Sequence, residues 1–308
     1  MNKITIIGAG RVGEATAQLL AIKELAREIV LIDIREGAAA GAALDIQESA
    51  ALFHFDTSVS GSTDMQLMVD SDLVIITAGV PRKPGMSRSD VLGTNLGVIN
   101  GIVDCMQDLA GEAMLIMVTN PVDVLTYCAW RRCGWPKNRV LGLSGVLDAA
   151  RMATFIALES GYATKDITAM VLGGHGDAMV PLPRYTCIKG IPVDHFLEQQ
   201  AIDAIVDRTR QGGAEILALK QTSSAYDAPA AAITEMVSAI VHDRRQILPC
   251  VSLLDGEYGQ TDIAMGVPVV IGDAGVEKVL QLNLSEAEAK HFAASAEQVR
   301  ADIDSLNL

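Results

Sequence analysis

The first half of the chain alternates between short β-branched apolar runs and longer amphipathic stretches. This alternation predicts βαβ units, in which helices connect parallel strands. Several predicted strands, such as Ile4–Ile7, are apolar almost throughout, as expected when helices cover both faces of a sheet. The pattern therefore predicts a six-stranded doubly wound domain. Its strands are expected over Lys3–Ile7, Glu28–Asp33, Thr57–Ser60, Leu73–Thr77, Met114–Thr119 and Arg139–Leu143, and its helices over Arg11–Ala26, Gly37–Phe53, Ser87–Leu109 and Val122–Cys133.

The pattern changes after about residue 145, where antiparallel pairing becomes the better expectation. Ser285 and Glu288 have the spacing of a capping box at the start of a terminal helix. With no linker visible, we expect residues 1–144 and 145–308 to form two domains that share a continuous interface, a usual place for an active site. The second domain is predicted to contain helices over Val146–Ser160, Asp194–Leu219, Pro229–Val241 and Ser285–Leu308, and strands near Asp166–Leu172, Leu182–Lys189, Ile247–Leu254 and Pro268–Ile271.

Composition narrows the range of partners. The chain has 308 residues, half of them apolar and a fifth charged, which indicates a compact globular protein. Its 24 basic and 38 acidic residues give a net charge of −14, which repels nucleic-acid phosphates and anionic lipid surfaces. Neither a nucleic-acid partner nor a membrane partner is therefore expected, and no apolar run approaches the roughly 20 residues that span a bilayer.

Cysteine usage and the N-terminus indicate the cytoplasm. The five cysteines form an odd count without a C-x-x-C pair, which fits free thiols in a reducing compartment better than disulfides or a zinc site. Residues 1–8 contain one lysine and a short apolar stretch without a cleavage-type ending, so we expect neither a signal peptide nor a transit peptide.

A glycine-rich motif, GAGRVG, occupies residues 8–13 between the first predicted strand and the first predicted helix. Gly8 permits a tight turn, Gly10 lets a pyrophosphate approach the backbone, and Gly13 lets the helix pack on the strand. Asp33, twenty residues after Gly13, ends the second predicted strand, where its carboxylate can accept hydrogen bonds from the adenosine ribose. Because this carboxylate would repel a 2′-phosphate, we expect NAD rather than NADP. The alternative is a flavin or another nucleotide in the same crevice.

Two loops after predicted strands carry polar residues suited to a site. The segment TAGVPRKPGMSR, residues 77–88, carries Arg82 and Arg88 and resembles a mobile lid, although a solvated basic loop is the alternative. Asn120, which follows the fifth strand, places an amide beside the cofactor crevice, unless it is only a turn residue before Pro121. Its tight position suggests a cis bond between Asn120 and Pro121.

Two further segments supply an aspartate, an arginine and a histidine. In SGVLDAAR, residues 144–151, Asp148 and Arg151 lie on one helix face, where they either neutralise each other or each address a different partner. In GGHGD, residues 173–177, flanking glycines leave His175 unobstructed at the end of an apolar strand. An acid/base role is favoured over a metal-binding or structural role, since no second histidine lies at zinc-ligand spacing. No metal is expected.

Together these motifs resemble the lactate/malate dehydrogenase family in order and spacing, over the whole length of the chain. The resemblance implies an N-terminal Rossmann doubly wound parallel sheet and a C-terminal α+β substrate domain. The lid resembles that of the malate-specific branch, because lactate-specific members carry glutamine where Arg82 stands. The resemblance thus implies NAD-dependent interconversion of (S)-malate and oxaloacetate, a place in the tricarboxylic acid cycle, and a homodimer or homotetramer.

The resemblance also implies residue roles. His175 would donate and accept the proton, with Asp148 fixing its tautomer and Arg151 clamping the carboxylate beside the reacting carbon. Arg88 would polarise the ketone, Arg82 would hold the second carboxylate, Asn120 would touch substrate and nicotinamide, and Ser224 would line the pocket floor. The expected contacts to NAD are Gly8, Ala9, Gly10, Arg11, Val12, Gly13, Asp33, Asn95, Val118, Thr119 and Asn120.

The chemistry is consistent with these roles. Hydride transfer to a ketone develops negative charge on its oxygen, so the step needs a proton donor with a near-neutral pKa and a nearby cation. The charge of Asp148 should raise the pKa of His175, whereas burial should lower it, and we expect the charge to win in the NADH complex. Two alternatives remain: a dehydrogenase of another 2-hydroxy acid such as lactate, in which Arg82 has no partner, and a non-catalytic dinucleotide sensor.

Overall fold

A computed structural model describes residues 1–80 and 88–306, with side chains from residue 91 onward in the second range. Its N-terminal half contains a parallel sheet in the order β3-β2-β1-β4-β5-β6, which confirms the predicted doubly wound arrangement. The strands run over β1 (Lys3–Ile7), β2 (Glu28–Ile32), β3 (Ser58–Ser62), β4 (Leu73–Ile76), β5 (Met114–Met117) and β6 (Val140–Gly142).

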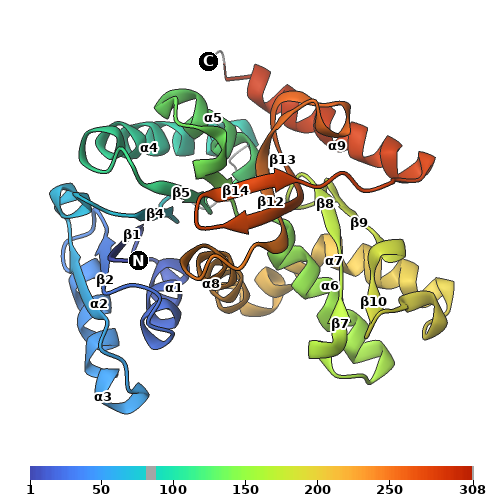
Figure 1. Cartoon of the computed structure of the whole chain (residues 1–308), viewed down its shortest axis with the longest axis horizontal. Coiled ribbons are helices and arrows are strands. Elements are labelled where there is room, and N and C mark those ends of the chain that lie inside the picture. Colours follow the sequence, from blue (N-terminus) through green and yellow to red (C-terminus); the bar gives the residue numbers. More distant parts are fainter. Residues whose placement is uncertain (81–87, 307–308) are drawn as a thin grey trace.

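The helices of this half cover both faces of the sheet (Figure 1). The helix predicted over Gly37–Phe53 is interrupted at Ser49, whose hydroxyl donates to the carbonyl oxygen of Ile46 and competes with the helical bonding. The first helix ends at Ile22 rather than Ala26, because Glu24 adopts a left-handed φ of 49°. The helices are α1 (Arg11–Ile22), α2 (Ala38–Glu48), α3 (Ala50–Phe53), α4 (Arg88–Leu109) and α5 (Val122–Cys133).

The C-terminal half combines helices with antiparallel strands, as predicted. The strand expected near Asp166–Leu172 is divided into two. Strand β14 (Gly275–Val279) was missed because three of its five residues, in the sequence GVEKV, are charged or glycine. The capping box of Ser285 and Glu288 is confirmed at the start of the terminal helix α9 (Glu286–Asp304). The helices are α6 (Gly145–Ser160), α7 (Gln199–Lys220), α8 (Asp227–Val241) and α9 (Glu286–Asp304), and the strands are β7 (Ile167–Thr168), β8 (Val171–Gly173), β9 (Met179–Pro181), β10 (Cys187–Ile188), β11 (Ile191–Pro192), β12 (Gln246–Asp255), β13 (Thr261–Gly272) and β14 (Gly275–Val279).

One sheet passes through both halves of the molecule. Strand β12 pairs with β6 through Val251 and Gly142, and the order continues to β13, β8 and β9, with β14 beside β13. Helix α8 packs against α1, and Figure 1 shows both helices near the centre of the molecule. A single large apolar cluster likewise includes side chains of both halves. The carboxyl ends of β1, β4 and β5 are thereby held facing the loop that follows β8.

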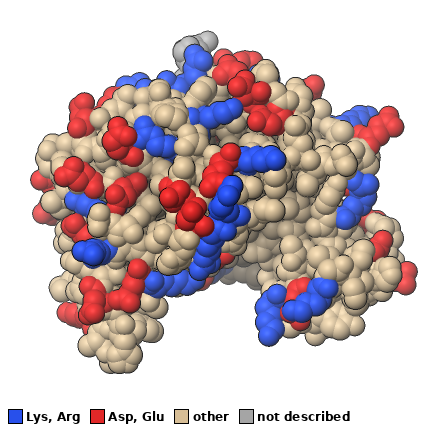
Figure 2. All heavy atoms as spheres, viewed as in Figure 1, with Lys and Arg blue, Asp and Glu red and all other residues tan. Residues whose placement is uncertain are grey.

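The surface carries charges of both signs. Lys and Arg side chains lie among Asp and Glu side chains on the face in Figure 2, and the outline is notched between the lobe with α2 and α3 and the lobe with β7. None of the helices in the described part of the chain combines the length and hydropathy that a membrane crossing requires.

Candidate active site

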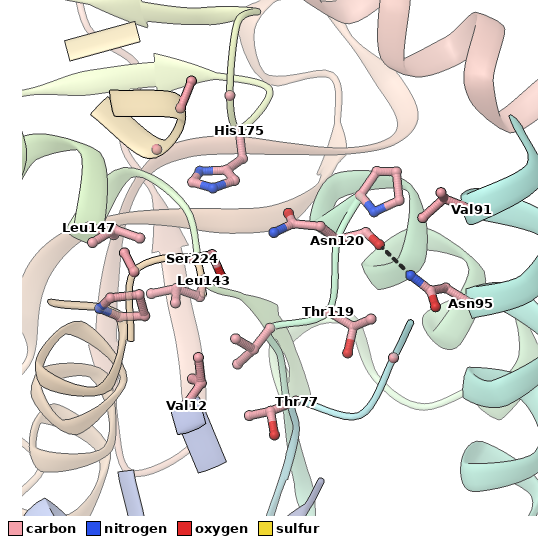
Figure 3. A pocket seen from close by; sticks show the side chains of 18 of the residues that line it. Val12, Thr77, Val91, Asn95, Thr119, Asn120, Leu143, Leu147, His175 and Ser224 are labelled. Atoms are coloured by element: carbon pink, nitrogen blue, oxygen red, sulfur yellow. Dashed lines mark hydrogen bonds between the residues drawn. The ribbon is translucent and has the colours of Figure 1, made fainter. Parts of the chain in front are cut away.

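A cavity of about 530 Å³ lies where the two halves meet. Its size falls within the range of small-molecule sites in proteins. In Figure 3, Val12 and Thr77 lie at one end, and the imidazole of His175 and the amide of Asn120 lie together at the other. The sequence-predicted residues that line it are Val12, Asn95, Val118, Thr119, Asn120, Arg151, His175 and Ser224.

The glycine-rich turn is built to admit a ligand beside the backbone. Gly8 has a φ of +108°, and a Cβ there would lie 2.6 Å from the backbone nitrogen of Ala78. A Cβ on Gly13 would overlap the carbonyl oxygen of Gly8. At Gly10, by contrast, a Cβ would meet no described atom within 4 Å. Gly8 and Gly13 thus serve packing, whereas the space beside Gly10 at the N-terminus of α1 is open, as pyrophosphate binding would require.

Asp33 lies directly after β2 and its carboxylate reaches this turn. Its Oδ2 accepts the N–H of Ala9 at 2.8 Å, and its Oδ1 accepts the N–H and Nε–H of Arg35 at 2.9 and 3.0 Å. Burial raises the pKa of Asp33, but the hydrogen bonds from Arg35 and Ala9 outweigh this effect and lower it. The carboxylate is therefore ionised and held beside the glycine-rich turn.

Asn95 and Thr119 brace the loops at the middle of the cavity. The Nδ2 of Asn95 donates to the carbonyl oxygen of Asn120 at 2.9 Å, and its Oδ1 accepts the N–H of Val80 at 2.7 Å. Figure 3 shows the first of these bonds. Thr119 donates to the carbonyl oxygen of Ala78 at 2.7 Å. The bond between Asn120 and Pro121 is cis, which confirms that hypothesis. The side chain of Asn95 thus positions two loops, a use that its sequence did not indicate.

His175 and Asp148 form a close pair at the wall of the cavity. The Nδ1 of His175 lies 2.9 Å from Oδ2 of Asp148, whose other oxygen lies 3.0 Å from Nη1 of Arg151. Asp148 therefore contacts the histidine and the arginine at once, so both interpretations of the Asp148 and Arg151 pair hold in part. Because Nδ1 is engaged, Nε2 is the ring nitrogen left for a ligand.

The charges around His175 set its protonation. Burial alone lowers its pKa, but the charge and hydrogen bond of Asp148 and the charge of Asp123 outweigh burial, and the net effect raises the pKa. The net effect is a raised pKa, and its persistence in the NADH complex stays a prediction. Arg151 is held beside the pair, and its buried Nε has no hydrogen-bond partner among the described residues. Arg151 also lines the cavity, and guanidinium groups bind carboxylate ligands well.

Asp123, on the first turn of α5, is a site residue that sequence reasoning missed. It is almost fully buried, and its Oδ2 accepts the backbone N–H of His175 at 2.8 Å. Burial raises its pKa to about 6, against hydrogen bonding and charge from His175, which lower it. Its Oδ1 is buried without a hydrogen-bond partner in the described structure. This carboxylate fixes the backbone of the histidine loop.

Two charged residues at the cavity were also not predicted. Arg210 on α7 and Asp177 in the histidine loop both line it. Arg210 donates to Asp207 at 3.1 Å and to the carbonyl oxygen of Met179 at 3.4 Å. The helical pattern of α7 gave no reason to separate Arg210 from surface arginines.

The side chains of both arginines of the predicted lid lie outside the described part of the structure. Arg82 lies outside the described residues, and Arg88 is described only as the first backbone position of α4. Their roles remain predictions from the sequence.

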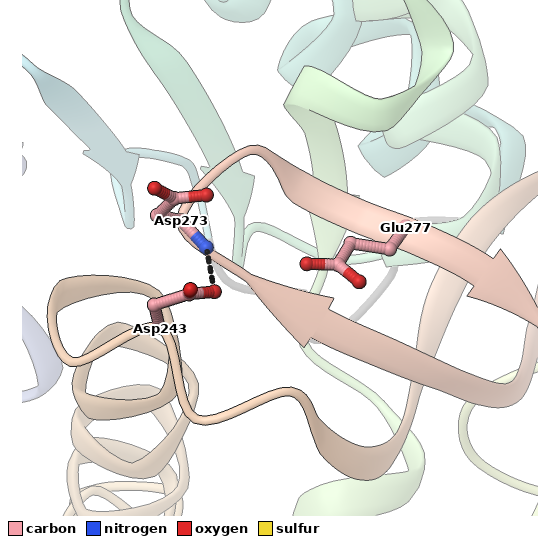
Figure 4. A group of neighbouring side chains, drawn as sticks. All are labelled: Asp243, Asp273 and Glu277. Carbon is pink, nitrogen blue, oxygen red and sulfur yellow. Dashed lines mark hydrogen bonds between the residues drawn. The ribbon is translucent and has the colours of Figure 1, made fainter.

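A group of three exposed carboxylates lies away from the cavity, near the turn between β13 and β14 (Figure 4). Oxygens of Asp243, Asp273 and Glu277 lie within 4.8 Å of one another. Asp243 accepts the N–H of Asp273 at 3.1 Å, and Glu277 accepts Nε–H of Arg245 at 2.8 Å. These contacts account for the positions of Asp243 and Glu277 at the turn.

Comparisons with known proteins find the same family along nearly the whole chain. Residues 2–142 match the model of the lactate/malate dehydrogenase NAD binding domain, and residues 145–307 match that of the alpha/beta C-terminal domain. A malate dehydrogenase of Thioalkalivibrio sulfidiphilus is 62% identical over 99% of this chain and 100% of its own length.

Solved structures of related proteins cover nearly the whole chain. The malate dehydrogenase of Salinibacter ruber superposes with a TM-score of 0.95 at 43% identity, covering 99% of this chain and 97% of that one. The lactate dehydrogenase of Cryptosporidium parvum, solved with lactic acid and cofactor, gives 0.96 at 37% identity, covering 99% and 98%.

Proposed function

This chain belongs to the lactate/malate dehydrogenase family, and we propose that it is a NAD-dependent malate dehydrogenase that interconverts (S)-malate and oxaloacetate. The observation that carries the proposal is the contact of His175 with Asp148, beside Arg151, in the cavity reached from the glycine-rich turn. Full-length relatives named malate dehydrogenase support the choice of substrate.

The dinucleotide would lie along the carboxyl ends of β1, β2, β4 and β5. The open space at Gly10 and the N–H groups at the start of α1 suit a pyrophosphate, and Asp33 suits the ribose. NAD, when bound, accepts or supplies the hydride. The remaining proposed contacts are Gly8, Ala9, Arg11, Val12, Gly13, Asn95, Val118, Thr119 and Asn120.

His175 would handle the proton of the reaction. In oxaloacetate reduction, the carbonyl carbon gains a C–H bond, and the imidazolium gives its Nε2 proton to the carbonyl oxygen as the C=O π bond opens. The products are a hydroxyl group and a neutral imidazole. In malate oxidation, the neutral imidazole takes the hydroxyl proton back. Asp148 favours the imidazolium and fixes the tautomer in which Nε2 meets the substrate.

Cationic side chains would hold the dicarboxylate and its developing charge. Arg151 lines the cavity and would bind the carboxylate next to the reacting carbon. From the sequence, Arg88 would polarise the carbonyl and Arg82 would pair with the second carboxylate. Asn120 lines the same end of the cavity as His175 and would orient the substrate by hydrogen bonding.

Lactate oxidation is the second candidate function, because the lactate dehydrogenase of Cryptosporidium parvum superposes on this chain with a TM-score of 0.96. Arg82 argues against it, since the methyl group of pyruvate offers this cation no partner. The test is oxidation of NADH by the purified chain with oxaloacetate or with pyruvate. The proposal predicts a large preference for oxaloacetate, and a preference for pyruvate or no turnover with either would overturn it.

We also propose a cytoplasmic homodimer or homotetramer that serves the tricarboxylic acid cycle. Five free cysteines support a reducing compartment. Exposed apolar side chains on α2 and α3, namely Leu44, Leu52 and Phe53, support contact with a second copy. Sedimentation of the purified chain tests the assembly, and a monomer at micromolar concentration would contradict it.

A further inference from the structure

The carboxylate proposed to select NAD is covered by a cation. Arg35 follows Asp33 by two residues, and its Nε donates to Oδ1 of Asp33 at 3.0 Å while Nη2 lies 3.3 Å from Oδ2. Nη2 also donates to the carbonyl oxygen of Ala9 at 3.0 Å. The guanidinium thus joins the glycine-rich turn to the end of β2.

These bonds leave Asp33 little capacity for a ribose. A carboxylate offers about four lone-pair positions, and the N–H of Ala9, the N–H of Arg35 and two guanidinium N–H groups already address them. Ribose hydroxyls can bind to Asp33 only if the guanidinium of Arg35 moves away from its carboxylate. Its side chain is 63% exposed, whereas that of Asp33 is 10% exposed, so Arg35 is the group that can move.

The pair also changes the charge that a 2′-phosphate would meet. Asp33 alone would repel it, but the pair of Asp33 and Arg35 is neutral, and a guanidinium binds phosphate oxygens through two parallel N–H groups. In dinucleotide-binding folds, an arginine near this position accommodates the 2′-phosphate. A displaced Arg35 remains tethered two residues from the ribose-binding carboxylate.

We propose that Arg35 is a coenzyme-specificity residue that lets this site bind the 2′-phosphorylated dinucleotide as well as NAD. The proposal rests on the proposed function only in placing a nicotinamide dinucleotide at Asp33. It revises the expectation from Asp33 alone, because that carboxylate does not face the cofactor as a free charge. It also assigns the guanidinium a role beyond support of the turn.

The test measures dissociation constants of NADH and NADPH by calorimetry for the full chain and three variants. Arg35→Gln keeps a polar side chain but removes its charge. Arg35→Lys keeps the positive charge but removes the two parallel N–H groups of the guanidinium. Arg245→Gln is the matched control, since Arg245 is a similarly exposed arginine that pairs with Glu277 near the turn between β13 and β14. Thermal melting of each variant checks its fold.

The expected result is that Arg35→Gln raises the ratio of the NADPH to the NADH dissociation constant at least tenfold. Arg35→Lys should raise it less, and Arg245→Gln should leave it unchanged. NADPH binding should also weaken more steeply with salt in the parent chain than in Arg35→Gln.

An unchanged ratio, including equally weaker binding of both cofactors, would overturn the proposal. Arg35 would then only hold the side chain of Asp33 in place. The assay with oxaloacetate is a separate readout. If the chain does not turn over oxaloacetate but Arg35→Gln changes the ratio of dissociation constants, only the proposed function is rejected. If the chain turns over oxaloacetate and the ratio does not change, only the role of Arg35 is rejected.

Discussion

Nδ1 of His175 lies 2.9 Å from Oδ2 of Asp148, so the loop after β8 and helix α6 meet at one hydrogen bond. The side chain of Asp148 is 1% exposed and that of His175 is 16% exposed. A buried carboxylate at this distance favours the imidazolium and holds one ring orientation. The geometry of the proposed proton transfer therefore depends on a residue that never needs to touch the substrate.

Replacing the histidine tests the proton-transfer role directly. His175→Gln removes the titrating group while keeping a polar side chain. We expect kcat for oxaloacetate reduction to fall by about a hundredfold to ten-thousandfold, the usual contribution of a positioned acid. Steady-state kinetics and NADH titration measure the effect. His54→Gln, at the exposed end of α3, is the control. Equal activity of the two variants would remove His175 from the mechanism.

Removing the charge of Asp148 should shift the pH profile. The charge of Asp148 contributes to the raised pKa of His175, so Asp148→Asn should lower that pKa. Oxaloacetate reduction requires the protonated imidazole and is lost as pH rises through this pKa. The loss should therefore occur at lower pH in the variant. The measurement is kcat/KM against pH, with Asp166→Asn, at a partly exposed aspartate that does not line the cavity, as control. An unchanged midpoint would mean that Asp148 does not set the protonation of His175.

Asp123 should make the stability of the protein depend on pH. Its pKa is raised from 3.8 to about 6 in the folded state, so between these values the folded chain binds more protons than the unfolded chain. Stability due to this group therefore falls as pH rises through that window and stays lower above it. A shift of this size corresponds to about 3 kcal/mol.

Asp123→Asn should remove this dependence, because the amide oxygen can still accept the N–H of His175 without carrying a charge. We expect the variant to match the parent chain near pH 4 and to exceed its free energy of unfolding by up to about 3 kcal/mol above pH 6. Urea unfolding at several pH values measures the difference. A variant that is destabilised equally at every pH would show that ionisation of Asp123 does not cause the pH dependence of stability.

Much of the site could be predicted because its residues follow apolar strands directly. The glycine-rich turn follows β1, Asp33 follows β2, and His175 follows β8, so each motif was placed by a strand that periodicity alone identifies. The sequence could not reveal Asp123, since an acidic residue in the first turn of a helix is ordinary. Its partner His175 is 52 residues away in the sequence.

The remaining misses have the same cause, namely contacts between distant segments. Arg210 reaches the cavity only because α7 packs beside α6, and Asn95 braces two loops that no local pattern connects. Strand β14 is too short and too charged to be recognised by alternation, and it forms because β13 offers it an edge. Sequence patterns over a few residues locate the motifs, but which residues the motifs contact is decided by the tertiary fold.

Substrate selectivity should depend on Arg82. Burying this cation against the methyl group of pyruvate leaves it without a partner, and loss of a charge-assisted contact costs roughly 1.5–3 kcal/mol, with more for an unmatched ion. Arg82→Gln should reduce oxaloacetate turnover by about a thousandfold and raise relative activity on pyruvate. Lys83→Gln removes a neighbouring charge and is the control. If the two ketoacids keep their relative rates in Arg82→Gln, selectivity resides in other residues.

Gly10 and Gly13 of the glycine-rich turn should respond differently to substitution by alanine. A Cβ on Gly10 meets no described atom within 4 Å, and its φ of −86° suits any residue. Gly10→Ala should therefore lower the free energy of unfolding by about 1 kcal/mol or less, the cost of a poorer helix cap. The added methyl group would occupy space proposed for the pyrophosphate, so the dissociation constant of NADH should rise at least tenfold.

Gly13→Ala should behave differently, because its Cβ would overlap the carbonyl oxygen of Gly8 inside the protein. Relief of that overlap requires α1 to move from β1, and overpacking of this kind costs about 1–3 kcal/mol. Urea unfolding and NADH titration of both variants separate the two effects. A stable Gly10→Ala that binds NADH as well as the parent chain would show that the pyrophosphate does not approach the backbone at this turn.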